Sequence, residues 1–85
     1  MNKLPKPIKI NVVFKGEIAD VVGKAEEMQT TSEGLEFIFF FHFLFTSYPE
    51  IPQNYPPGVL RYLLNGKPPQ NETILKDGDE LVFYI

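Results

Sequence analysis

The first pattern in the chain is an alternation of apolar and polar residues over 8–14. A spacing of two is typical of a strand with one buried face. The next segment, 18–22, has apolar residues at helical spacing and is followed by Gly23, so it predicts one or two helical turns. The polar segment 24–30 is short enough for an edge strand. The face of the first strand that we expect to be buried consists of Ile8, Ile10, Val12 and Phe14.

Residues 33–48 hold six of the eight phenylalanines and allow two interpretations. The β propensity of aromatic residues favours a strand, in which alternate positions would place phenylalanines on one face. We favour a helix, because polar residues such as Glu36 and Ser47 then gather opposite one apolar stripe. Thr31 or Ser32 would supply the oxygen that caps its first turn. The predicted buried stripe consists of Phe37, Ile38, Phe41, Leu44, Phe45 and Tyr48.

The second half of the chain predicts strands separated by turns. Four of the ten residues in 49–58 are proline, which favours a loop. Residues 59–64 predict a strand, and the apolar run 81–85 predicts a central strand covered on both faces. This order predicts an α+β fold in which one long helix lies across one face of a sheet. We expect residues 1–85 to form a single domain.

Charge and composition narrow the classes of partner. The chain of 85 residues has a net charge of −3, so we expect no binding to nucleic acid. Its longest apolar stretch, 35–45, is about half of the ~20 residues that a membrane span requires, so we expect no membrane insertion. The absence of cysteine excludes disulfides and thiolate metal sites, and it is consistent with a cytoplasmic location.

Three segments resemble small sulfur-carrier proteins of the MoaD/ThiS group. Residues 14–23, Phe-Lys-Gly-Glu-Ile-Ala-Asp-Val-Val-Gly, resemble the segment after that group's first strand. Leu64-Asn-Gly66 and residues 74–83, Ile-Leu-Lys-Asp-Gly-Asp-Glu-Leu-Val-Phe, are similar to its later strand, its turn and its Leu-x-Asp-Gly-Asp-Glu-Val hallmark. The resemblance covers nearly the whole chain. It implies a ubiquitin-like β-grasp fold, with a mixed sheet, a grasped helix at 33–48 and parallel first and last strands.

The resemblance also implies a chemistry that this sequence does not fully support. In the MoaD/ThiS group, a mobile Gly-Gly tail carries the carboxylate that is adenylated and converted to a thiocarboxylate. The sequence here stops at Ile85, inside the predicted last strand. We therefore expect a non-catalytic protein-binding module without a cofactor. The alternative is a sulfur carrier for molybdopterin or thiamine synthesis, with Ile85 supplying the charged carboxylate and an adenylating enzyme or a synthase subunit as partner.

The excess of phenylalanine suggests a binding surface. One helix face suffices to cover a small sheet, yet a helical wheel places Phe40 and Phe43 near the polar side and Phe39 on the far flank. Clustered exposed aromatics usually mark an interface, so these three residues are the candidate partner-binding site. The partner would be another protein or a second copy of the chain, unless segment 3–7 or the proline-rich loop covers the aromatics. We interpret His42 as a residue on the helix flank, and expect no catalytic or metal site.

Overall fold

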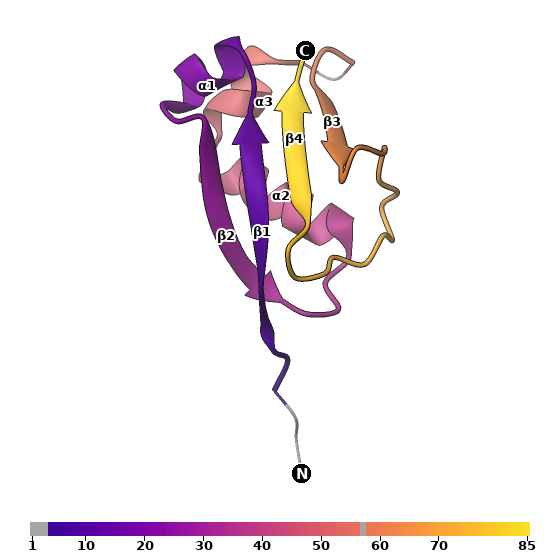
Figure 1. Ribbon diagram of the computed structural model, residues 1–85. Coiled ribbons are helices and arrows are strands. Elements are labelled where there is room, and N and C mark those ends of the chain that lie inside the picture. The colour runs from indigo at the N-terminus through magenta and orange to yellow at the C-terminus, as the bar shows by residue number, and fades with distance from the viewer. Residues whose placement is uncertain (1–3, 57) are drawn as a thin grey trace.

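The computed structural model describes residues 4–56 and 58–85, which form a four-stranded sheet with helices packed on one face (Figure 1). The strands are β1 (Pro7–Phe14), β2 (Glu26–Ser32), β3 (Arg61–Leu64) and β4 (Glu80–Tyr84). The helices are α1 (Glu17–Val22), α2 (Phe37–Ser47) and α3 (Glu50–Asn54). None of the helices in the described ranges has both the length and the apolar character needed to cross a bilayer.

The strand order is β2-β1-β4-β3, so the first and last strands lie side by side in the centre of the sheet. β1 runs parallel to β4, with Val13 opposite Val82, whereas β2 and β3 are antiparallel to their neighbours. The expected mixed sheet and the parallel pairing of the first and last strands are confirmed. The short helix and the edge strand expected at 18–22 and 24–30 are also present, as α1 and β2.

The phenylalanine-rich run is helical, but α2 begins at Phe37 without the expected cap. Thr31 and Ser32 belong to β2, and no side chain caps the first turn. Instead, the N–H of Phe37 donates to the carbonyl of Thr73 (2.7 Å), and the N–H of Ile38 donates to the carbonyl of Asn71 (3.1 Å). Carbonyl groups of the loop before β4 thus accept hydrogen bonds from N–H groups in the first turn of α2, which have no partner within the helix.

The hydrophobic core lies between the sheet and the helices, and every second residue of β1 contributes to it. The predicted stripe of α2 is partly correct, since Phe37 and Leu44 are buried while its other members are half-buried. The buried residues are Ile8, Ile10, Val12, Phe14, Ile18, Phe37, Phe40, Leu44, Ile51, Tyr55, Leu64, Leu75, Leu81 and Phe83.

The loop expected at 49–58 is wrong for residues 50–54, which form α3. Pro49 precedes the helix and Pro52 lies in its first turn, where a missing N–H removes no intrahelical bond. The fully buried Ile51 anchors α3 against the core. Pro57 of the same segment lies outside the described residues.

Candidate protein-binding site

The outer face of α2 carries two of the three candidate aromatics. Phe39 is 57% exposed and Phe43 is 51% exposed. The expected exposure of Phe40 is wrong, because this residue is fully buried. Phe40 lies one turn from both Phe37 and Leu44, so the buried side of the helix extends further toward it than the predicted stripe did. The rings of Phe40 and Phe43 are stacked, with centroids 6.4 Å apart.

The N-terminal segment does not cover these aromatics. Residues 4–6 are exposed, and the chain there extends away from the sheet and the helices (Figure 1). Leu4 is 86% exposed. Lys3, the first residue of the segment considered as a cover, lies outside the described residues.

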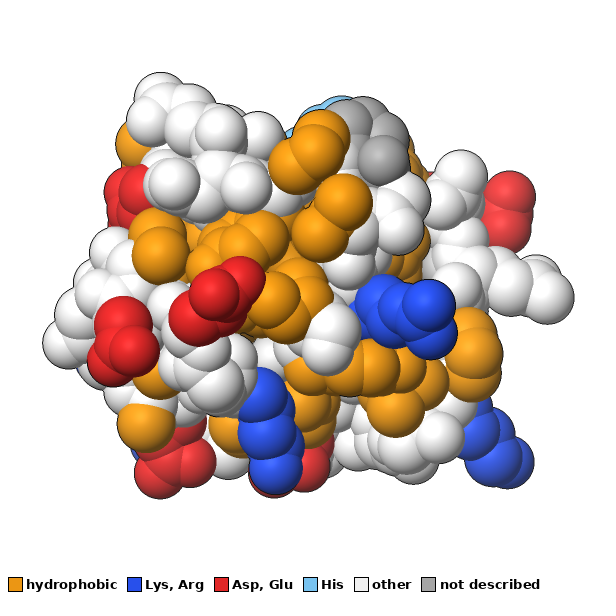
Figure 2. Space-filling view, turned by 90° about the horizontal axis from the view of Figure 1, so that it is seen from above, with side chains coloured by type: hydrophobic (Ala, Val, Ile, Leu, Met, Phe, Trp, Pro, Cys, Tyr) orange, Lys and Arg blue, Asp and Glu red, His pale blue; other side chains and the backbone are white. Residues whose placement is uncertain are grey.

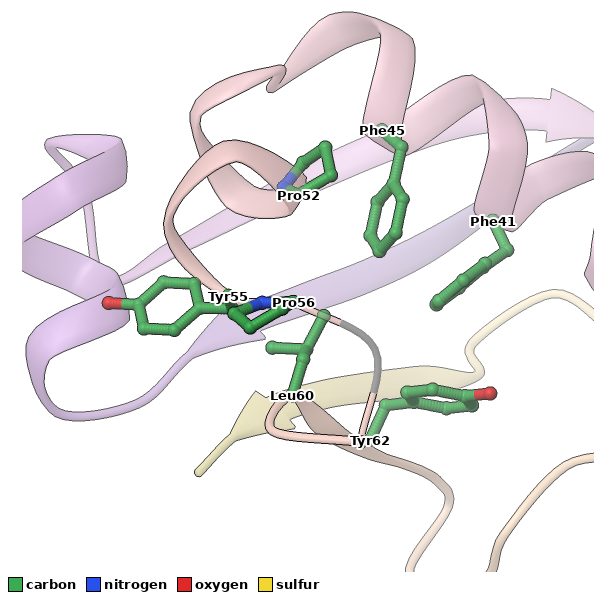
Figure 3. A pocket seen from close by; sticks show the side chains of 8 residues that line it. Phe41, Phe45, Pro52, Tyr55, Pro56, Leu60 and Tyr62 are labelled. Carbon is green, nitrogen blue, oxygen red and sulfur yellow. The ribbon is translucent and has the colours of Figure 1, made fainter.

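A half-open apolar pocket of about 330 Å³ lies between α2, the segment that contains α3, and β3. Figure 3 shows apolar side chains from all three converging on it. Leu60, a lining residue, directly precedes Arg61 at the start of β3, and Arg61 pairs with Tyr84 at the end of β4. The pocket therefore lies at the same end of the sheet as Ile85. The lining residues are Phe41, Phe45, Pro52, Tyr55, Pro56, Gly58, Leu60 and Tyr62.

Aromatic contacts hold one wall of the pocket in place. The ring of Phe41 lies 4.4 Å from that of Phe45 and 4.7 Å from that of Tyr62, measured between centroids. Tyr62 also stacks on the buried Phe37. Because these rings are supported by the core, the wall presents a rigid aromatic surface.

Tyr55 borders the pocket, but its ring and hydroxyl point away from the other lining side chains, toward α1 (Figure 3). Burial raises the pKa of this hydroxyl, and the negative charges of Glu17 and Asp20 raise the pKa further. The phenol is therefore neutral near neutral pH, and it supplies no charge to the pocket.

Apolar side chains also form a broad band at this end of the molecule. Figure 2 views that end from above, with most of the acidic side chains toward the left and the basic side chains toward the right and the bottom. The exposed apolar residues include Val59, which is 44% exposed, and Ile85, which is 51% exposed. The pocket therefore belongs to a larger apolar surface bordered by charges.

The acidic turn before β4 is held by hydrogen bonds within the chain. Asp79 accepts from the side-chain amide of Asn65 (2.8 Å) and from the N–H of Lys76 (2.8 Å). Asp77 accepts from the N–H of Lys9 (2.7 Å). Among the described residues no group of acidic, histidine or cysteine side chains is arranged to hold a metal ion. The carboxylates of Asp77 and Asp79 thus hold the loop in place.

The candidate residues do not form one cluster. His42 is exposed on the outer side of α2, and its carbonyl accepts a hydrogen bond from the Thr46 hydroxyl (3.0 Å). Phe39 and Phe43 are also on this helix, whereas the pocket is walled by other residues. Sequence reasoning missed the pocket because its proline-rich wall was predicted to be a loop. The available signal was the helical spacing of Ile51 and Tyr55, both of which are buried.

Comparisons with known proteins concern the fold. No protein-family model matches the sequence, and no curated protein matches it. The structure is similar to that of a candidate molybdopterin converting factor, subunit 1, from Pyrococcus furiosus. That likeness has a TM-score of 0.75 at 19% identity, and it covers 89% of this chain and 94% of the other.

Two small archaeal modifier proteins are similar as well. Small archaeal modifier protein 1 of Haloferax volcanii matches with a TM-score of 0.74 at 15% identity, covering 89% of this chain and 92% of the other. The protein of the same name from Methanosarcina acetivorans matches with a TM-score of 0.67 at 20% identity, covering 92% of each chain. At these identities the likeness establishes the fold. The chain therefore has the ubiquitin-like β-grasp fold that the sequence resemblance implied.

Proposed function

We propose that this chain is a non-catalytic protein-binding module that docks a partner protein at the apolar pocket. The observation that carries the proposal is the half-open cavity of about 330 Å³ with aromatic and aliphatic walls. A cavity of this kind accepts one large apolar side chain of a partner, and buried apolar anchors supply most of the energy of many interfaces. The proposal keeps the cytoplasmic location expected from the sequence.

The position of the pocket favours partners of the kind that the resemblance implies. An adenylating enzyme or a synthase subunit would approach the end of the sheet where β4 finishes, and the pocket opens at that end. The same position supports the alternative function, a sulfur carrier in cofactor synthesis, in which a carboxylate beyond β4 is charged. Both functions predict docking at the pocket, and only the carrier predicts a covalent change.

The test mixes the purified chain with an adenylating enzyme of molybdopterin synthesis, with and without ATP. Isothermal titration calorimetry measures binding, and amide chemical shifts map the contact surface. We expect the shifts to centre on Leu60 and Tyr62. Leu60→Asp places a charge at the pocket, so it should weaken binding at least about tenfold. Leu4→Asp is the matched control, since Leu4 is exposed and lies far from the pocket, and it should leave binding unchanged.

Intact mass after the reaction with ATP and a sulfur donor separates the two functions. An unchanged mass together with pocket-centred binding supports the module. Replacement of one oxygen by sulfur identifies a carrier and contradicts the non-catalytic proposal. Absence of binding to both the adenylating enzyme and the large subunit of the synthase overturns docking to this class of partner.

A further inference from the structure

β2 is an edge strand whose outer side has no neighbouring strand. The ladder to β1 includes the N–H of Phe14 donating to the carbonyl of Ala25 (2.7 Å) and the N–H of Glu33 donating to the carbonyl of Lys6 (2.9 Å). In an antiparallel pair the bonded residues alternate along each strand, so the odd-numbered residues of β2 direct their backbone groups toward β1. The even-numbered residues direct theirs to the open edge. They are Glu26, Met28, Thr30 and Ser32.

Apart from the charges of Glu26 and Glu27, this edge lacks the features that usually prevent strands from pairing between molecules. The register with β1 is continuous from Pro7–Ser32 to Val13–Glu26, without a bulge, and β2 contains neither proline nor lysine. The other edge differs, because β3 has only four residues and its Leu64 N–H bonds to the carbonyl of Lys67 (2.8 Å). β2 is therefore the edge better suited to extend the sheet.

We propose that two copies of this chain associate by antiparallel pairing of their β2 strands, with Gln29 facing Gln29 on the two-fold axis. Directly opposite residues of an antiparallel pair point to the same face of the sheet. The helices of both copies therefore lie on one face of the joined sheet only when odd-numbered residues oppose odd-numbered ones and even-numbered residues oppose even-numbered ones. Among these, the register centred on Gln29 pairs Met28 with Thr30 and Glu26 with Ser32. All outward-facing backbone groups of β2 then find partners.

The charges along β2 also favour this register. Glu26 faces Ser32 and Glu27 faces Thr31, so no two carboxylates are opposed. Shifting the centre to Thr30 would oppose Glu27 and Glu33, which is destabilising between directly opposite residues.

The exposed Phe43 lies on the part of α2 that is nearer to this edge. Phe37, at the start of α2, stacks on Tyr62 of β3, whereas Tyr48, which follows the helix, contacts Phe14 of β1. α2 therefore crosses the sheet from β3 toward β1, and its last turns lie on the side of β2. Phe43 belongs to this half of the helix and is 51% exposed. A second copy beside β2 would therefore come closer to Phe43 than to Phe39.

This proposal does not depend on the proposed docking function. The pocket borders β3, whereas the pairing uses the opposite edge of the sheet. A substitution at one surface is therefore expected to leave the other unaffected. Leu60→Asp should bind partners poorly and still dimerise.

The first experiment tests the register by disulfide formation, in a chain that has no cysteine of its own. Gln29 would face its own copy in a non-hydrogen-bonded pair, with Cα atoms about 4.5 Å apart, which suits a disulfide. Gln29→Cys should therefore form a covalent dimer under mild oxidation. Thr31→Cys is the matched control, because the same register separates the two Thr31 residues by about 13 Å. Equal cross-linking of both variants, or none with Gln29→Cys, overturns the register.

The second experiment measures mass in solution by size-exclusion chromatography with light scattering. Thr30→Pro removes an N–H that points to the open edge, so the protomer keeps its own ladder. It should weaken dimerisation by about 30-fold, through one lost hydrogen bond in each copy. Thr30→Ala retains the N–H and should dimerise like the parent, whereas Phe43→Ser should weaken the dimer. Circular dichroism verifies that each variant folds, and a parent chain that is monomeric at millimolar concentration overturns the proposal.

Discussion

The side chain of Asn65 joins two strands through a hydrogen bond to Asp79, with 2.8 Å between Nδ2 and the carboxylate Oδ1. The carbonyl oxygen of the same side chain accepts from the N–H of Glu80 (2.9 Å). Asn65 also has a φ of +52°, in the left-handed region that few residues other than glycine and asparagine adopt readily. One residue thus closes the turn after β3 and fixes the start of β4.

Replacing Asn65 tests this double role. Asn65→Ala loses both side-chain hydrogen bonds and places alanine at a positive φ, so we expect unfolding free energy to fall by about 2–4 kcal/mol. Asn65→Gly loses the hydrogen bonds but tolerates the backbone angle, and it should cost only about 1–2 kcal/mol. Urea unfolding measures both. Equal losses in the two variants would show that the backbone angle contributes nothing.

Phe40 and Phe43 are neighbours on α2 with opposite environments, since Phe40 is fully buried and Phe43 is half exposed. Phe40→Ala should lower the unfolding free energy by about 3–5 kcal/mol, because it leaves a cavity in the core. Phe43→Ala should cost less than about 1 kcal/mol. Thermal unfolding compares the two, and similar losses would contradict the burial of Phe40. For this reason the tests of association use Phe43 and not Phe40.

The raised pKa of Tyr55 predicts a loss of stability in alkali. The ordinary value is 10.0, and burial together with Glu17 and Asp20 keeps the phenol protonated in the folded chain above that pH. The unfolded chain then releases a proton that the folded chain retains, so stability is intact below pH 10 and falls as the pH rises through the folded pKa. Urea midpoints measured across this range should fall more steeply for the parent than for Tyr55→Phe. Parallel curves would contradict the shift.

Ile51 anchors α3 and hence one wall of the pocket. Ile51→Ala should lower the unfolding free energy by about 2–4 kcal/mol, and Ile51→Val by about 1 kcal/mol. Amide hydrogen exchange should accelerate in α3 more than in β1 for the alanine variant, because a short helix depends on packing for its stability. Uniform acceleration along the chain would show that α3 is not separately anchored.

Local patterns predicted most of the elements. The alternation in β1 identified its buried face correctly, and the polar residues of 33–48 distinguished a helix from a strand where aromatic propensity pointed the other way. The parallel contact between β1 and β4 was implied by the resemblance, because no periodicity shows which strands become neighbours. The start of α2 was predicted too early, because its first N–H groups bond to carbonyls of Asn71 and Thr73, far away in the sequence.

The binding surfaces were harder to predict than the elements. The exposure of Phe39 and Phe43 was predicted correctly, whereas Phe40 was predicted to be exposed and is buried, since a shift of the buried stripe by one position reverses the environment of a residue at its border. The pocket needs walls from α2, from the segment around α3 and from β3, so it exists only once these are packed together. No single segment of the sequence therefore indicates this pocket.

The pairing of β1 with β4 has a consequence for how the molecule is made. Val13 and Val82 are opposite each other, so the strand that completes the middle of the sheet is synthesised long after the first one. While the nascent chain lacks Glu80–Tyr84, β1 has no partner on one side and the core lacks Leu81 and Phe83. Closing so long a loop carries an entropic cost before any contact offsets it. The sheet and the core can therefore be completed only after this segment has emerged from the ribosome.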